Sequence, residues 1–135
     1  MQHMHNRRNV MSSEQLAQET KAYKRLTKKL TKENLWIYIL RLLQDRPMYG
    51  YEIRQKIQEN FDFSPARVSC YVVLYKMERE GLVDTSWEES PMGRPDRKYY
   101  NATELGKKLM LNAKEFLEQL LEDVFSDKVY ENMKS

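Results

Sequence analysis

Basic residues gather on a glycine- and proline-containing loop within the stretch GRPDRKYYNATELGKK, residues 93–108. Gly93 and Pro95 favour a tight turn. Arg94 at such a tip can enter the minor groove of a DNA duplex, where the narrow shape concentrates negative potential. Arg97 and Lys98 follow where a strand would begin, and they can bind flanking phosphates. An isolated loop of this kind is better explained as a solvated turn, so a DNA contact here depends on the helices and strands that carry the loop.

A second set of candidate contacts lies on a helix expected to begin at Ser64, which can cap it, with Pro65 in its first position. The major groove is wide enough for one helix, and side chains near the helix N-terminus reach furthest into it. Arg67 can bind O6 and N7 of a guanine, and a valine can contact a thymine methyl group. Lys76 is either a peripheral phosphate contact or a solvated cation. Ser64 itself is a candidate DNA contact at the helix start, and the candidate base readers are Arg67, Val68, Ser69 and Val72.

Catalytic and metal chemistry find little support in the sequence. Cys70 is the single cysteine, which excludes an internal disulfide and a Cys-rich zinc site. It is either a small core residue or, if exposed beside Arg67, a redox sensor. His3 and His5 are the only histidines and lie near the N-terminus, and no Ser or Cys nucleophile accompanies a base in a recognisable motif. We therefore expect no metal site, no cofactor and no enzymatic activity.

Length and composition indicate one domain with an appendage. The chain has 135 residues, of which 41% are hydrophobic. Its longest apolar run, residues 35–40, is too short to span a bilayer, and its N-terminus lacks the apolar block of a signal peptide. We expect a cytoplasmic protein without a membrane partner. The net charge of +3 conceals a basic arm, because residues 1–30 hold seven Lys and Arg against two Asp and Glu. Such an arm can attract a polyanion or simply form a solvated helix face.

The two ends of the chain are predicted to lie outside the core. Residues 1–11 are expected to be a disordered tail, and residues 12–32 an N-terminal basic helix capped by Ser12 or Ser13. The narrow apolar stripe of that helix, which includes Leu16 and Tyr23, is unstable alone and must pack on another helix, from this chain or from a second copy.

Three helices are expected to form the core. The first, from Asn34 to about Asp45, is apolar nearly all round and is therefore covered on more than one side. The second runs over residues 49–60, with Gly50 allowing close packing at its start and Tyr51 and Glu52 in structural roles. The third ends at the helix-terminating Gly81. Its predicted buried stripe is Tyr71, Val73, Leu74 and Met77.

A hairpin and a final helix follow. Residues 82–88 and 97–103 alternate with a period of two and predict strands that flank the basic loop. Tyr99 and Tyr100 are expected to brace the second strand against the helices. Thr103 caps a helix over residues 104–135, in which Gly106 permits a close approach. Helices followed by a hairpin predict a mainly α fold, a winged helix-turn-helix over residues 33–103, with the C-terminal helix serving for dimerisation.

The motifs of residues 34–110 resemble those of the PadR family of bacterial and archaeal transcriptional regulators. They include Gly50-Tyr51-Glu52, the spacing of Tyr71, Leu74 and Met77 before Glu80-Gly81-Leu82, and Arg97-Lys98-Tyr99-Tyr100 followed by Thr103 and Gly106. Each motif alone is weak, but their order and spacing are specific. Val68 and Val72 depart from the family pattern, which often has Gly and Pro there, and this leaves sequence preference open.

The resemblance implies a dimer joined through the terminal helices, in agreement with the uncovered apolar stripes. It also implies that the Tyr71 hydroxyl binds a backbone phosphate, against the alternative of core packing. Some family members bind phenolic or flat aromatic effectors at the dimer centre, and here Trp36, Tyr38 and Trp87 are either such a cavity or ordinary packing. The expected interface residues are Leu16, Tyr23, Leu109, Phe116, Leu120 and Val124.

Together, these features favour a sequence-specific DNA-binding transcriptional regulator. We expect a homodimeric repressor that reads a pseudo-palindromic operator in double-stranded DNA. The alternative is a winged-helix module that binds proteins without DNA, although such a module has no need for cations at Arg67, Arg94, Arg97 and Lys98 on one face.

Overall fold

The computed structural model describes residues 10–127, 131 and 133. The chain divides into two compact units, residues 1–34 and residues 35–135. Residues 1–9 of the expected tail lie outside the described residues, and Val10 and Met11 belong to no helix or strand.

The first unit contains two short helices rather than the single helix predicted over residues 12–32. Helix α2 spans Ser13–Gln18, α3 spans Lys21–Lys29, and the 3-10 turn η1 spans Lys32–Asn34. The break lies at Thr20, whose backbone is extended and whose hydroxyl accepts a hydrogen bond from Tyr23 N at 3.2 Å. Threonine side chains compete with helix hydrogen bonding and favour caps, so the basic segment is interrupted there.

The core of the second unit forms around α4, Leu35–Leu43. As its sequence predicts, this helix is covered on several sides, and its buried residues are joined by side chains from every other element of the unit. The helix packs against α5, α6, β3 and α7. Its buried members are Leu35, Ile39, Leu40, Leu42 and Leu43.

Helices α5, Gly50–Phe61, and α6, Arg67–Arg79, pack on α4 and on each other. The turn into α6 does not begin where the sequence predicts: the N-cap is Ala66, and Pro65 is buried before it. Ser64 is exposed and precedes the cap, so its predicted capping role is wrong. The end of α6 agrees with prediction, because Gly81 follows it with a φ of +79°, a backbone conformation that glycine adopts without strain.

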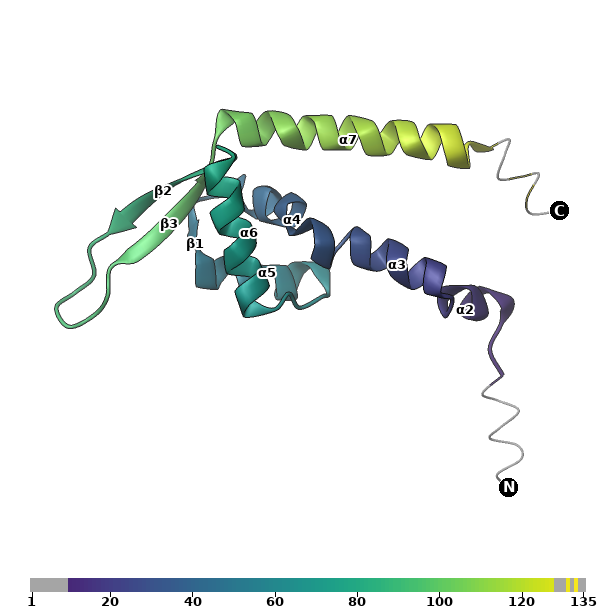
Figure 1. Cartoon of the computed structure of the whole chain (residues 1–135), viewed down its shortest axis with the longest axis horizontal. Coiled ribbons are helices and arrows are strands. Elements are labelled where there is room, and N and C mark those ends of the chain that lie inside the picture. The colour runs from purple at the N-terminus through teal and green to yellow at the C-terminus, as the bar shows by residue number, and fades with distance from the viewer. Residues whose placement is uncertain (1–9, 128–130, 132, 134–135) are drawn as a thin grey trace, which may run out of the picture. The chain divides into compact units, whose positions relative to one another are not determined.

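Three antiparallel strands form a small sheet in the order β1-β3-β2 (Figure 1). The predicted hairpin is confirmed as β2, Val83–Glu88, and β3, Arg97–Ala102, with Thr85 opposite Tyr100. Strand β1, Met48–Tyr49, was not predicted, and it pairs with the other edge of β3. The sheet therefore ties the start of α5 to the hairpin, since Tyr49 is followed directly by Gly50.

Helix α7, Glu104–Phe125, begins above the core in Figure 1 and extends beyond it, with Leu109 and Met110 near its start packed against the core. It starts at the predicted cap, where the Thr103 hydroxyl accepts a hydrogen bond from Gly106 N at 3.1 Å. Gly106 is buried, and a Cβ there would collide with the carbonyl oxygen of Leu82, so the close approach expected of this glycine is confirmed. Helix α7 covers residues 104–125 of the predicted 104–135; residues 128–130, 132, 134 and 135 lie outside the described ones.

The predicted fold class is confirmed: the protein is mainly helical, with one small sheet carrying a hairpin. Within the described residues, no helix combines the length and apolarity needed to cross a membrane.

Candidate nucleic-acid interface

The outward face of α6 carries the candidate base readers at its N-terminal end. Arg67 is the first residue of the helix, and Val68 has 74% of its surface exposed. Ser69 and Val72 are also exposed, and Lys76 lies further along the helix, exposed as well. No side chain caps the start of α6, because Ala66 stands at the cap. The first turn therefore offers backbone N–H groups and a guanidinium at the same end.

Tyr71 belongs to this outward face and not to the core, so its predicted place in the buried stripe is wrong. Its side chain is 42% exposed, whereas Cys70 is fully buried and packs with Leu74 and Met77. The Tyr71 ring lies against Gly50, where a Cβ would come within 2.5 Å of Tyr71 Cε1. The predicted close packing at Gly50 is thus confirmed, and the residue it accommodates is this tyrosine.

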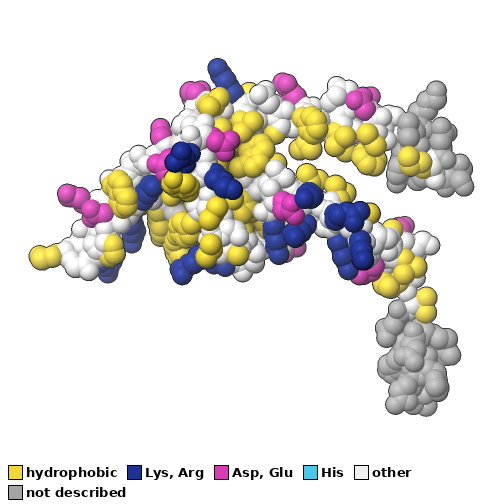
Figure 2. All heavy atoms as spheres, in the orientation of Figure 1, with side chains coloured by type: hydrophobic (Ala, Val, Ile, Leu, Met, Phe, Trp, Pro, Cys, Tyr) yellow, Lys and Arg dark blue, Asp and Glu magenta, His cyan; other side chains and the backbone are white. Residues whose placement is uncertain are grey.

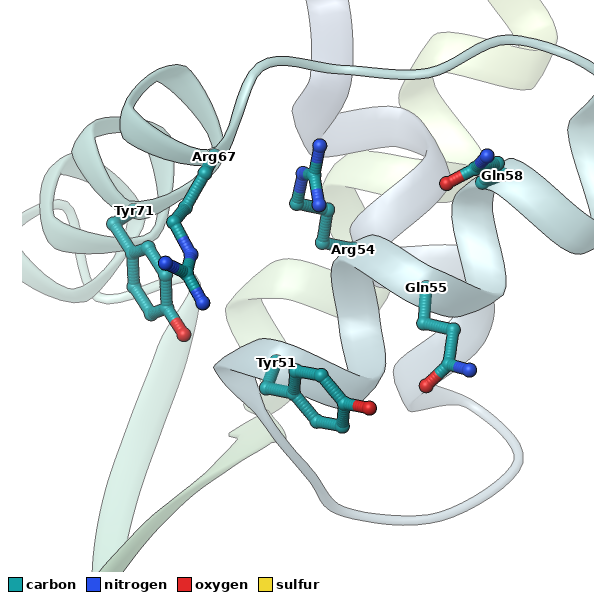
Figure 3. A pocket seen from close by; sticks show the side chains of 6 residues that line it. All are labelled: Tyr51, Arg54, Gln55, Gln58, Arg67 and Tyr71. Carbon is teal, nitrogen blue, oxygen red and sulfur yellow. The ribbon is translucent and has the colours of Figure 1, made fainter.

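A pocket of about 230 Å³ lies between α5 and the start of α6 (Figure 3). Arg67 and Tyr71, one turn apart on α6, both extend into it, and Tyr51 lines it from the first turn of α5 with its ring directed toward Gln55. Tyr51 was predicted to be structural, but its side chain is 54% exposed. The lining consists of Tyr51, Arg54, Gln55, Gln58, Arg67 and Tyr71.

A second, shallower pocket of about 420 Å³ joins α6 to the hairpin. Tyr71 lines this pocket too, together with Trp87 from β2 and Arg97 from β3. Because Tyr51 and Tyr71 border both pockets, Arg67 on α6 and Arg97 on the hairpin belong to one continuous surface. The full lining is Tyr49, Gly50, Tyr51, Tyr71, Trp87, Asp96, Arg97, Lys98 and Tyr100.

Aromatic rings hold Arg97 in place on this surface. Its guanidinium carbon lies 5.1 Å from the centre of the Tyr49 ring, a cation–π distance. Tyr49 stacks on Tyr51 with ring centres 5.7 Å apart and meets Tyr99 edge-on at the same distance. The predicted bracing role of Tyr99 and Tyr100 is confirmed, since Tyr100 is buried in the core.

Lys98 is held by an acidic partner. Its Nζ lies 3.2 Å from Glu78 Oε1, and the Thr85 hydroxyl donates to the other carboxylate oxygen of Glu78 at 3.1 Å. Lys98 also lies over the Tyr100 ring, 5.5 Å from its centre. This cation is therefore engaged in joining the hairpin to the end of α6, whereas no ion pair is found for Arg67, Arg94 or Arg97 among the described residues.

The tip of the hairpin is a tight turn that presents Arg94. Arg94 N donates to Pro91 O at 3.1 Å, and Gly93 takes a φ of +87° within that turn. Ser90 N donates to Asp96 Oδ1 at 3.2 Å, which ties the two sides of the loop together. Arg94 is exposed beyond this tie.

Glu52 fixes the start of α5, as predicted. Its carboxylate accepts a hydrogen bond from Tyr49 N at 3.3 Å and one from Arg46 Nη2 at 2.7 Å. The Arg46 guanidinium holds the pKa of the Glu52 carboxyl below its ordinary value. Tyr49 and Tyr51 are therefore presented from a helix end that side chains clamp in place.

The remaining candidate sites occupy separate places. Cys70 is a buried filler, and burial raises the pKa of its thiol to about 11. Among the described residues no group of His, Cys, Asp and Glu could hold a metal, and His3 and His5 lie outside them. Trp36 and Tyr38 pack on the core from α4, Tyr38 edge-on to Phe61 and Phe63. Trp87 is on the hairpin and 67% exposed.

The expected interface residues are mostly exposed. Leu16 and Tyr23 in the first unit are 53% and 41% exposed. In the second unit, Phe116, Leu120 and Val124 are 68%, 41% and 45% exposed, and Figure 2 shows hydrophobic side chains along the length of α7. Leu109 differs, because it packs partly against the core cluster.

A family model confirms what these motifs indicate. Residues 39–112 match the model described as the transcriptional regulator PadR-like family, which is more than half of the chain. An uncharacterised protein from Lysinibacillus sphaericus is 35% identical over 71 residues, a match that covers 51% of this chain and 64% of that protein.

Solved structures of regulators share the fold. A PadR-like transcriptional regulator from Bacillus cereus has a TM-score of 0.58 at 30% identity, with 72% of this chain and 92% of that chain covered. A PadR family regulator from Clostridium difficile has a TM-score of 0.57 at 27% identity, with 67% and 96% covered. Bacillus subtilis PadR in complex with operator DNA has a TM-score of 0.54 at 25% identity, with 58% and 45% covered. The chain therefore belongs to the PadR-like family, whose members are transcriptional regulators and not enzymes.

Proposed function

We propose that this chain regulates transcription by binding double-stranded DNA in a sequence-specific manner. One observation carries the proposal: Tyr71 borders both pockets and thereby joins the exposed end of α6 to the cationic hairpin in one surface. Two cations from distant parts of the sequence, Arg67 and Arg97, lie on that surface. Further support comes from the similar Bacillus subtilis PadR, which was solved with operator DNA.

Helix α6 is the proposed reader of the major groove. Arg67, Val68, Ser69 and Val72 are exposed at its N-terminal half, which is where side chains reach base edges. A bidentate contact from Arg67 to a guanine would contribute about 1–3 kcal/mol of discrimination against other bases. Lys76, further along, would bind a peripheral phosphate.

The hairpin is the proposed wing. Arg94, exposed at the tight tip, would enter the minor groove, while Arg97 would bind a flanking phosphate from its seat on Tyr49. Lys98 would contribute less to phosphate binding than the sequence indicated, because Glu78 already neutralises part of its charge. Phosphate contacts of this kind position the protein without specifying sequence.

A homodimer would give two such surfaces. The exposed apolar side chains of α7 would meet those of a second copy, and the apolar stripe of the first unit would add to this interface. Two recognition helices related by a two-fold axis read a pseudo-palindrome with half-sites about one helical turn apart. Repression would follow from occupying an operator, and a ligand that changes the spacing of the helices, such as a small aromatic effector, would relieve it.

The proposal is tested by selecting bound sequences from a random DNA pool and measuring affinity over a range of salt concentrations. A DNA-binding regulator should enrich a two-fold symmetric motif and lose affinity steeply as salt rises. Arg67→Ala should relax the selected motif at one position per half-site. Failure to bind DNA or heparin at low salt would refute the proposal and favour a protein-docking winged helix.

A further inference from the structure

We propose that the pocket between α5 and α6 seats one phosphate of the DNA backbone in each half-site. Tyr51 and Gln55 of α5 would act there with Tyr71 of α6, beside the Arg67 side chain that reads a base. This seat presupposes the DNA binding proposed above and assigns to it residues of α5 that the sequence motifs had left in structural roles. It also separates the phosphate contact at α6 from base reading.

The chemistry of the lining matches an anion. All six side chains carry hydrogen-bond donors, two of them are arginines, and none is a carboxylate. Arg54 already donates from Nε to Pro65 O at 2.9 Å. Within the described part of the chain, no hydrogen bond or ion pair engages the Arg67 guanidinium, the amides of Gln55 and Gln58, or the hydroxyls of Tyr51 and Tyr71. Donors gathered without an acceptor are suited to an oxyanion from outside the chain.

The donors are also held in position before any ligand arrives. Tyr51 stacks on Tyr49, and the Tyr71 ring rests against Gly50. The bond from Arg54 to Pro65 O fixes the segment between the two helices. Figure 3 shows Arg67 and Tyr71 directed toward Tyr51 across the opening. A site whose side chains are already oriented loses less conformational entropy on binding.

The place of the pocket favours a backbone phosphate over a base edge. Val68 and Val72, two of the exposed candidate base readers of α6, do not line it. In a helix-turn-helix the second helix enters the groove while the first crosses the backbone, and the pocket lies between those two helices. Its volume of about 230 Å³ would admit a phosphate group with its ester oxygens.

The seat makes a distinctive energetic prediction because its three proposed donors, on Tyr51, Gln55 and Tyr71, are neutral. Removing a neutral donor lowers affinity without changing the number of counterions released, so the salt dependence should stay constant. The test variant is Tyr51→Phe combined with Gln55→Ala, and the matched control is Tyr75→Phe combined with Gln44→Ala. Tyr75 is equally exposed on α6, at 58%, but its hydroxyl accepts a bond from Arg79 and it lines neither pocket.

Affinity is measured by fluorescence anisotropy with the duplex obtained from selection. The test variant should bind about tenfold more weakly than the wild type, with an unchanged salt slope, and the control should bind like the wild type. Each phosphate is then replaced in turn by a neutral methylphosphonate. The wild type should lose affinity at one additional phosphate per half-site, at which the test variant shows no further loss.

Wild-type affinity in the test variant would overturn the seat, as would losses that simply add at every methylphosphonate. In either case DNA binding by the wild type would leave the proposed function standing. A wild type that selects no sequence and binds no DNA would overturn both. Circular dichroism of the variants identifies any loss of folding, and because Tyr51 and Gln55 are exposed we expect none.

Discussion

Lys98 on the wing and Glu78 near the end of α6 form an ion pair of 3.2 Å across twenty residues of sequence. Thr85 on the neighbouring strand bonds the same carboxylate. The pair therefore links both strands of the hairpin to the helix proposed to lie in the major groove. Both side chains are about one-third exposed, so the ion pair adds little to the stability of the fold. Its main effect is to orient the hairpin relative to α6.

We predict that Lys98→Ala weakens DNA binding less than Arg97→Ala does. Glu78 already compensates the charge of Lys98, whereas among the described residues the Arg97 guanidinium lies over the Tyr49 ring and forms no ion pair. Arg97→Ala should reduce the slope of log affinity against log salt by about one, and Lys98→Ala by less. Equal slopes for the two variants, measured by anisotropy titration, would contradict this division of roles.

Arg94→Ala should weaken binding to all DNA sequences by a similar factor and should not unfold the domain. Arg94 is exposed at the wing tip, and it takes part in the bonds that close the loop through its backbone N, which an alanine retains. The measurements are affinity for selected and unrelated duplexes, with thermal unfolding as the control. Unchanged affinity and salt slope would exclude Arg94 from the interface.

Leu120→Glu combined with Val124→Glu should produce monomers in sedimentation velocity. Both residues are exposed on α7. Two glutamate carboxylates at these positions would therefore destabilise a dimer interface and leave the monomer core intact. Leu111→Glu is the matched control, because Leu111 is also exposed but lies about 180° around the helix from Leu120. A dimer that survives the double substitution would place the interface elsewhere.

Gly106→Ala and Gly50→Ala should have different consequences. A Cβ at residue 106 would meet the backbone oxygen of Leu82, which cannot move aside, so unfolding should become easier by about 1–3 kcal/mol. A Cβ at residue 50 would meet the Tyr71 ring, which can rotate away. Gly50→Ala should therefore cost less stability but weaken DNA binding. Urea unfolding and anisotropy separate these effects, and a larger stability loss at residue 50 would contradict the packing described.

The Cys70 thiol should resist alkylation in the folded protein at pH 8 and react once the protein unfolds. Burial raises its pKa to about 11, so the native thiol stays protonated where an exposed one ionises. A raised native pKa means that this contribution to stability is complete below the unfolded pKa, near 9, and is lost as pH rises toward 11. Rapid modification of the native protein would instead indicate an exposed thiol and revive a sensing role.

Much of the fold can be predicted because it depends on local regularities. Side-chain type alternates in residues 82–88 and 97–103 because one face of the sheet is buried and the other exposed. The turn-forming residues between the two segments then predict a hairpin. Thr103 and Gly81 act through their own backbone geometry and need no distant partner. Strand β1 had no comparable signal, since two residues are too few to show a period and only pairing with β3 makes them a strand.

The wrong predictions have a shared physical cause, because each depends on contacts made in the folded protein. A tyrosine at residue 71 fits an apolar stripe or a polar surface equally well, and the smaller Cys70 took the core position beside Leu74. Ser64 and Pro65 form a good helix start, but the buried Pro65 and the bond from Arg54 to its carbonyl hold that segment in the turn. Lys98 is cationic in sequence, and nothing local reveals that Glu78 will lie beside it.

By itself, the sequence determined the order of the core helices and the hairpin, the Thr103 cap and the cationic loop, because periodicity and backbone preference act over a few residues. Only the tertiary structure decided that Tyr51 and Gln55 join Arg67 and Tyr71 around one pocket, and that Tyr71 connects this pocket to the wing. Such convergence depends on how α5, α6 and the sheet pack around α4. Packing brings together residues that are distant in the sequence, and no local sequence pattern predicts that they will be in contact.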